Sequence, residues 1–133
     1  MILLDTHVVL WWQAGGGRLS ARAAREIARA DVLLVSPITC WEIATLVTKK
    51  RIALDREVHT WVRDLLGGDR VQAAPLTPQA ATSAGVLQDS GFPGDPADRF
   101  LCATAREQLV PLVTKDDRIR TFARETGELR TIW

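Results

Sequence analysis

Met1-Ile2-Leu3-Leu4-Asp5 opens the chain with four apolar residues followed by an acid. A short, continuously apolar run of this kind is typical of a β-strand that is covered on both faces. The pattern returns at residues 32–35 and 110–113, and weaker candidates lie at residues 70–76 and 129–133. These runs predict a sheet of four to five strands.

Helical patterns lie between these runs. Three of them begin with a capping side chain directly before a proline, a pairing favoured at helix starts, at Ser36-Pro37, Thr77-Pro78 and Asp95-Pro96. A fourth is expected to begin at Asp55 and to end at Gly67-Gly68. Because strands alternate with helices, the predicted fold class is α/β, with a central, mainly parallel sheet between two helical layers.

The size and composition of the chain are those of an ordinary globular protein. Its 133 residues are 47% hydrophobic and 25% charged, which predicts a single domain over residues 1–133 that folds without metal or disulfide staples. A net charge of +1 gives no bulk attraction to nucleic acid. Cys40 and Cys102 lack partners at metal-ligand spacing, and the apolar start is too short for export or a membrane span. A cytoplasmic protein without membrane contact is expected.

Two acids follow predicted strands. Asp5 ends the first strand, and Asp116 comes shortly after the strand at residues 110–113. In open parallel sheets, binding sites form beyond the carboxyl ends of the strands. Both acids are therefore expected on the same edge of the sheet.

Two more acids lie on apolar faces of predicted helices. Asp98 begins a stripe at helical spacing that continues with Leu101 and Ala105. Glu42 has apolar residues one turn before and one turn after it on its own helix. Both acids are therefore expected to face inward, towards the same edge as the strand-end acids.

Four carboxylates at one edge would repel each other, by about 4 kcal/mol per pair at ~4 Å and an effective dielectric constant of 20. Protonation or a divalent cation relieves this repulsion, and an all-oxygen donor set suits Mg²⁺ or Mn²⁺. Such an ion can orient and acidify a water molecule for attack on a phosphodiester. Taken singly, each acid is also compatible with a structural role: Asp5 in a strand-end turn, Asp98 in the first turn of a helix, and Asp116 or Asp117 as the cap of a helix over residues 117–124.

Four segments, taken in order, resemble a known family. They are Leu3-Leu4-Asp5-Thr6-His7, Ser36-Pro37-Ile38 through Trp41-Glu42-Ile43, Gly94-Asp95-Pro96-Ala97-Asp98-Arg99-Phe100 with Ala103-Thr104-Ala105, and Leu112-Val113-Thr114-Lys115-Asp116. Together they are similar to the PIN domain, specifically to the VapC toxins of bacterial type II toxin–antitoxin pairs. The resemblance implies a three-layer α/β/α nuclease fold and a metal-dependent endoribonuclease with an acidic Mg²⁺ or Mn²⁺ site.

The resemblance also implies the residues of the site. The family's acidic quartet, which would supply the catalytic residues and metal ligands, corresponds to Asp5, Glu42, Asp98 and Asp116. The family's hydroxyl positions beside the first and last acids correspond to Thr6 and Thr114. Asp95 and Asp117 are extra acids expected near the site, in a supporting or capping role. Asp95 is at the same time the expected cap of the helix that begins at Pro96.

Partners follow from the same resemblance. A small VapB-like antitoxin would wrap the toxin and present an arginine to the carboxylates, two toxin chains would pair as a homodimer, and RNA would be the substrate. The candidate RNA contacts are Lys49, Lys50 and Arg51, at the end of the Glu42 helix, and Arg99. Because a solvated surface is the ordinary role of such charges, their binding to RNA phosphates is a hypothesis.

Two alternatives from other functional classes stay open at this point. In a receiver-type signalling domain, Asp5 would accept a phosphoryl group with Lys115 as the assisting cation, although the usual paired acids after the first strand are missing. In a non-catalytic binding subunit, the acids would only cap helices and the tryptophans would form the interface. The residues expected in the core or at a protein interface, with base stacking less favoured, are Trp11, Trp12, Trp41 and Trp61.

Overall fold

The computed structural model describes residues 1–89, 91–92 and 94–133, and in this part of the chain one or two helices separate successive strands, of which there are five, with seven helices. In chain order they are β1 (Ile2–Leu4), α1 (Thr6–Gln13), α2 (Ala21–Arg29), β2 (Leu33–Val35), α3 (Pro37–Thr48), α4 (Val58–Leu66), β3 (Val71–Ala73), α5 (Pro78–Asp89), α6 (Pro96–Gln108), β4 (Leu112–Val113), α7 (Asp117–Thr126) and β5 (Thr131–Ile132). Within these ranges, no helix has both the length and the apolar character needed to cross a bilayer.

The strands form one sheet in the order β3-β2-β1-β4-β5, and every neighbouring pair is parallel. β1 lies at the centre, between β2 and β4. β4 is shorter than the apolar run at residues 110–113 because Pro111 has no N–H to donate to the ladder. The carbonyl of Pro111 still accepts a hydrogen bond from the Leu3 amide at 3.0 Å.

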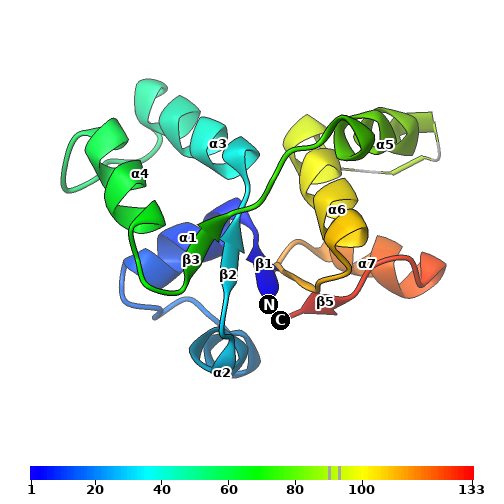
Figure 1. The fold of residues 1–133 in the computed structure, drawn as a ribbon, viewed down its shortest axis with the longest axis horizontal. Coiled ribbons are helices and arrows are strands. Elements are labelled where there is room, and N and C mark those ends of the chain that lie inside the picture. Colours follow the sequence, from blue (N-terminus) through cyan, green and yellow to red (C-terminus); the bar gives the residue numbers. More distant parts are fainter. Residues whose placement is uncertain (90, 93) are drawn as a thin grey trace.

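Helices cover both faces of this sheet, which confirms the predicted three-layer α/β/α fold (Figure 1). Side chains along a strand point to alternate faces. Ile2 and Leu4 therefore pack in the core beneath α1, α2, α3 and α4, whereas Leu3 packs in the core beneath α5, α6 and α7. All three side chains are buried, as a central strand with continuous apolar sequence requires.

The order of the strands places two strand ends together. From β1 the chain adds β2 and β3 on one side, and it then crosses to the other side to add β4 and β5. The carboxyl ends of β1 and β4 thus lie side by side where the connections diverge, which is the usual place for a site in a parallel sheet. Asp5 directly follows β1, and residues 114–116 directly follow β4.

Most predicted helix starts are confirmed, and one is wrong. All three caps before prolines accept a hydrogen bond from an amide in the first turn of their helix. α4, however, begins at Val58 and not at Asp55, because Glu57 accepts hydrogen bonds from two amides of its first turn, each at 3.0 Å. Asp55 instead accepts hydrogen bonds from the side chain of Arg56.

The tryptophans divide between core and surface. Trp61 is buried, and Trp11 and Trp12 are half-buried. Trp41 is 59% exposed on α3, so the expectation that it lies in the core of this chain is wrong. The other expected role for Trp41, a contact with a second protein, stays a prediction.

Candidate active site

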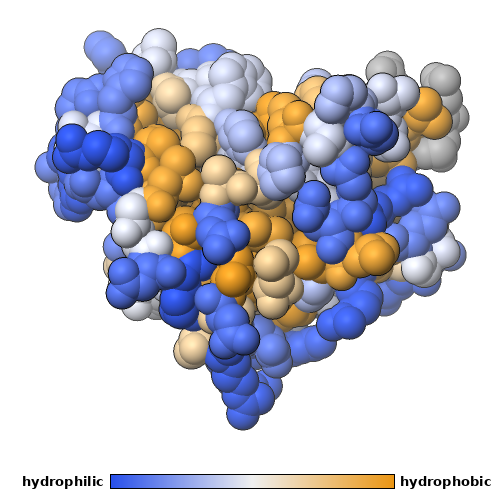
Figure 2. Space-filling view, in the orientation of Figure 1, coloured by the Kyte–Doolittle hydropathy of each residue, from blue (hydrophilic) through white to orange (hydrophobic). Residues whose placement is uncertain are grey.

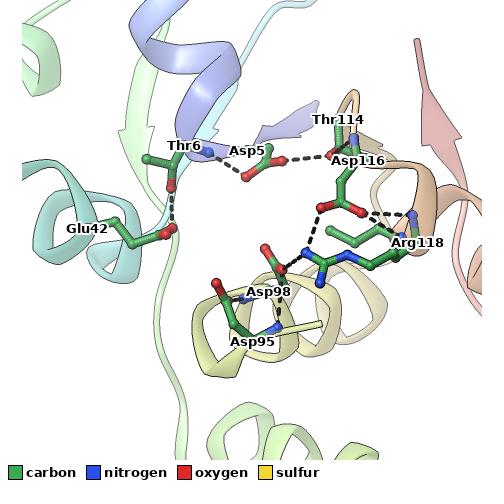
Figure 3. Close-up of polar contacts among 9 residues, drawn as sticks. Asp5, Thr6, Glu42, Asp95, Asp98, Thr114, Asp116 and Arg118 are labelled. Atoms are coloured by element: carbon green, nitrogen blue, oxygen red, sulfur yellow. Dashed lines mark hydrogen bonds and ion pairs between the residues drawn. The ribbon is translucent and has the colours of Figure 1, made fainter. Parts of the chain in front are cut away.

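Four elements contribute acids to one cavity at the carboxyl edge of the sheet. Asp5 follows β1, Asp116 follows β4, Glu42 comes from α3 and Asp98 comes from α6. The cavity has a volume of about 430 Å³, and its lining residues are Asp5, His7, Trp11, Glu42, Asp95, Asp98, Lys115, Asp116 and Arg118. The structure thus brings together the four acids singled out from the sequence, and their side chains face a common space (Figure 3).

Asp5 is only 8% exposed, and both oxygens of its carboxylate are hydrogen-bonded. Oδ1 accepts from the Thr6 amide at 2.7 Å, which caps α1, and Oδ2 accepts from the Thr114 hydroxyl at 2.7 Å. Burial raises the pKa of Asp5 above its ordinary value, and the two hydrogen bonds oppose that rise. The carboxylate is therefore held in one orientation by the first helix and by the end of β4.

Glu42 is half-buried on α3 and is also held by a hydroxyl group. Thr6 Oγ1 donates to Glu42 Oε1 at 2.5 Å. Thr6 Oγ1 also lies 3.1 Å from Thr39 Oγ1. Burial raises the pKa of Glu42, and the hydrogen bond from Thr6 opposes the rise. Thr6, the residue directly after Asp5, thus links the beginning of α1 to the acid on α3.

Asp98 lies in the first turn of α6, in a reciprocal capping box with Asp95. The Asp98 amide donates to Asp95 Oδ1 at 3.0 Å, and Asp98 Oδ2 accepts from the Asp95 amide at 3.3 Å. Burial, together with the charges of Asp95 and Asp5, raises the pKa of Asp98 to about 7. These effects outweigh the guanidinium of Arg118, whose Nη2 lies 3.7 Å from Asp98 Oδ2.

Asp116 caps α7 and forms an ion pair with a residue of that helix. Its Oδ1 accepts from the amides of Arg118 and Ile119 at 2.8 and 3.2 Å, and its Oδ2 accepts from Arg118 Nη2 at 3.1 Å. Burial acts to raise the pKa of Asp116, but the hydrogen bonds from Arg118 and Ile119 bring it below its ordinary value. Thr114 Oγ1 accepts from the Asp116 amide at 3.1 Å while it donates to Asp5, so one hydroxyl joins both strand-end acids.

The structural roles considered for single acids are therefore also present. Asp5, Asp95 and Asp116 each cap a helix. Because the same three side chains line the cavity, capping does not remove them from the site. A cap fixes the position of a carboxylate, which is what a site of several carboxylates needs.

Arg118 is the site residue that sequence reasoning missed. Its guanidinium pairs with both Asp116 and Asp98, at 3.1 and 3.7 Å, and it thereby joins α7 to α6 across the cavity (Figure 3). An arginine two residues after an acid at a helix start has no distinctive spacing. Its position near Asp98 depends on how α6 packs beside β4, which the sequence does not show.

Several residues expected near the site lie elsewhere. The side chain of Asp117 is 93% exposed and pairs with Arg120 at 3.4 Å, so it does not line the cavity. The reason is that Asp116, and not Asp117, is the cap of α7, which leaves Asp117 on the solvent side of the first turn. The basic residues predicted to contact RNA also lie outside the acid cavity; they are Lys49, Lys50, Arg51 and Arg99.

The donor set fits a hard divalent cation in its chemistry. All of the converging acids offer carboxylate oxygens. Burial raises the pKa values of Asp5, Glu42 and Asp98, and neighbouring carboxylates add to the rise. Among the described residues, no three carboxylate, imidazole or thiol groups are already placed so that they could hold an ion. Arg118 supplies the positive charge between Asp98 and Asp116 in this arrangement.

Comparison with known proteins identifies relatives over nearly the whole chain. Residues 2–125 match the PIN domain family. Ribonuclease VapC22 of Mycobacterium tuberculosis is 44% identical over 120 residues, which cover 90% of each chain. These two matches rest on sequence alone.

Solved structures show the same fold at much lower sequence identity. The chain matches VapBC2 from Rickettsia felis, bound to a promoter DNA fragment, with a TM-score of 0.68, 15% identity and coverage of 98% of this chain and 97% of that one. It matches VapBC-1 from nontypeable Haemophilus influenzae with a TM-score of 0.68, 20% identity and coverage of 98% and 96%. Taken with the sequence matches, these results show that the chain belongs to the PIN-domain family, in the group of the VapC ribonucleases.

Proposed function

We propose that this protein is a metal-dependent endoribonuclease that hydrolyses RNA phosphodiesters, and that residues 1–133 act as one nuclease domain. The observation that carries the proposal is the convergence of four carboxylates from four elements on one cavity. The 44% identity to a ribonuclease over 90% of both chains supports it. The receiver-type alternative has less support, because Lys115 lies over the ring of Trp11 and, within the described residues, forms no ion pair with Asp5.

The roles of the side chains follow from their contacts. Asp5, Glu42, Asp98 and Asp116 would hold Mg²⁺ or Mn²⁺, directly or through water. When bound, the ion supplies positive charge to the phosphodiester and lowers the pKa of the attacking water. Thr114 and Thr6 fix the orientation of Asp5 and Glu42 before any ligand arrives. Arg118, once it turns away from the acids, can donate to a phosphate oxygen.

The test is cleavage of a pool of total tRNA and rRNA in Mg²⁺, in Mn²⁺ and in EDTA. Cleavage is expected only with a metal, and Asp5→Asn or Asp98→Asn should each reduce it by more than about a hundredfold, because even outer partners of metal ligands are worth 10–100-fold. Both variants should fold, because asparagine at position 5 still caps α1 and asparagine at position 98 keeps a side-chain oxygen that can accept from the Asp95 amide. Asp117→Asn is the matched control, since that acid lies outside the cavity. Full activity of either site variant would count decisively against the proposal.

We also propose that the protein is the toxin of a type II toxin–antitoxin pair in the cytoplasm. The two solved structures described above are VapBC complexes, and an excess of carboxylates in the cavity suits an arginine from a VapB-like antitoxin. Both cysteines are free, which agrees with a reducing compartment. The test is co-purification with the product of a short reading frame next to this gene, and suppression of RNA cleavage by that product.

A homodimer is the further proposed assembly. Large apolar side chains are exposed on α3, on α5 and in the segment before α5, at Trp41, Val86 and Leu76. Apolar residues also gather towards the middle of the face shown in Figure 2, with hydrophilic residues around them. Exposed apolar patches are typical of protein interfaces. Light scattering should give the mass of two chains, and Trp41→Ser should shift the equilibrium towards the monomer.

We also propose that RNA phosphates contact four basic residues, Lys49, Lys50, Arg51 and Arg99. The first three are exposed at the end of the helix that carries Glu42. Reversal of their charges should weaken RNA binding and lower its dependence on salt. Cleavage with an unchanged salt dependence would remove these residues from the proposal.

A further inference from the structure

A second cavity adjoins the acid cavity across two side chains. It has a volume of about 740 Å³, and it shares His7 and Trp11 with the acid cavity. These two residues lie one turn apart on α1, so they occupy the same face, and their ring centroids are 5.8 Å apart. A ligand that extends from the acids into the second cavity therefore passes over His7 or Trp11, and Trp11 offers the larger ring.

Trp11 is held in position but is not covered. Its ring centroid lies 5.9 Å from that of Trp133, and Lys115 Nζ lies 5.8 Å from the ring centroid. The side chain is half-buried, so part of the indole faces the cavities. A ring that neighbours already hold loses little conformational freedom when a second ring stacks on it.

Each of the two cavities that Trp11 lines also contains a cation. Lys115 lines the acid cavity and Arg18 lines the second cavity, and within the described part of the chain neither side chain is in an ion pair with a carboxylate. Arg56 also lines the second cavity, but its positive charge is already neutralised by ion pairs with Asp55 and Asp64. Two unneutralised cations around an accessible aromatic ring match the alternation of phosphate and base along a single strand.

We propose that Trp11 is a base-stacking subsite for the nucleotide next to the scissile phosphate, with Lys115 and Arg18 in contact with the adjoining phosphates. This proposal rests on the proposed ribonuclease function and adds a substrate contact to it. The ligand is single-stranded RNA, because only an unstacked base can lie on an aromatic side chain. The apolar residues of the second cavity also suit a peptide, but Lys115 and Arg18 favour a polyanion at this end.

The test is the Kd of an oligoadenylate with a fluorophore at its 5′ end, measured by anisotropy in EDTA so that it is not cleaved. Trp11→Ala should raise this Kd about tenfold, because a stacked base contributes strongly to single-strand binding, whereas Trp11→Phe should keep most of the affinity. Trp12→Ala is the matched control: Trp12 is half-buried on the same helix but lines neither cavity. In cleavage assays of the complete enzyme, Trp11→Ala should raise KM and leave kcat nearly unchanged.

Lys115→Ala gives a second readout that does not depend on the folding of the Trp11 variants, because Lys115 is exposed. It should reduce the slope of log Kd against log salt by about 1. An unchanged Kd and slope in folded Trp11→Ala and Lys115→Ala proteins would overturn the subsite and leave the second cavity to a peptide. Failure of the proposed function has a different signature: oligoadenylate would bind through Trp11, but the tRNA and rRNA pool would stay intact.

Discussion

The two halves of the acid cavity are stabilised by different chemistry. Asp5 and Glu42 accept hydrogen bonds from threonine hydroxyls, whereas Asp98 and Asp116 pair with Arg118. A hydroxyl orients a carboxylate and leaves its charge, but a guanidinium also neutralises it. The carboxylates of the threonine half are therefore fixed in direction, and those of the arginine half are partly neutralised by one guanidinium. A divalent cation is expected to displace Arg118 and to leave the two threonine contacts in place.

Charge in the arginine half should control the stability of the metal-free protein. Asp98 has an ordinary pKa of 3.8 that the fold raises to about 7, so its contribution to stability is complete below pH 3.8 and is lost as the pH rises through about 7. We expect the Tm in EDTA to fall by several degrees between pH 5 and pH 8 and Asp98→Asn to remove the larger part of that fall. Asp117→Asn should leave the fall unchanged, and a Tm of the wild type that does not vary with pH would contradict the prediction.

The hydroxyl of Thr114 should matter most for metal affinity. It is fully buried and holds Asp5 Oδ2, so Thr114→Val should weaken Mn²⁺ binding about 10–100-fold, the usual effect of removing an outer partner of a metal ligand. Isothermal titration calorimetry measures this directly. Thr114→Ser, which keeps the hydroxyl, should bind Mn²⁺ nearly as well as the wild type; equal losses in both variants would show that packing and not the hydrogen bond is responsible.

Thr6→Val should have a smaller effect on the same titration, below about tenfold. The reason is that Glu42 is only half-buried, so water can replace part of the lost hydrogen bond. The two threonine variants therefore rank the two acids of this half. A larger loss in Thr6→Val than in Thr114→Val would reverse the ranking and make Glu42 the principal ligand.

Arg118→Ala should strengthen Mn²⁺ binding, by up to about fivefold, because the cation no longer competes with an ion pair that is itself half-exposed and weak. The same variant should bind RNA less well if Arg118 donates to a phosphate. Arg120→Ala is the control, since Arg120 pairs with Asp117 outside the cavity. Weaker Mn²⁺ binding in Arg118→Ala alone would mean that Arg118 organises the carboxylates and does not compete for them.

Local patterns predicted the main features of the fold and of the acid cluster. Asp5 was found because it ends a continuous apolar run, and Asp98 because it stands on the apolar stripe of a helix. Both signals are periodic and depend only on neighbouring residues. The same kind of signal identified three caps before prolines, each of which accepts a hydrogen bond from its helix.

The features that could not be predicted are of two kinds. Some depend on contacts between segments far apart in the sequence, and others depend on which of two similar neighbouring residues caps a helix. Arg118 reaches Asp98 only because α6 and α7 lie on the same side of the sheet. Glu57, and not Asp55, caps α4 because two amides of the first turn donate to it. The sequence pattern does not distinguish these two acids as caps. The order of the strands within the sheet likewise follows from packing of the whole chain.

The capping box of α6 has a consequence for how the site can be observed. Asp98 Oδ2 accepts the amide proton of Asp95, so any reorientation of that carboxylate towards a cation takes this partner from the backbone at the beginning of α6. Amide hydrogen exchange at residues 95 and 98 should therefore change when the site is loaded. The first turn of this helix is a built-in reporter of occupancy, readable by NMR or mass spectrometry without a substrate and without turnover.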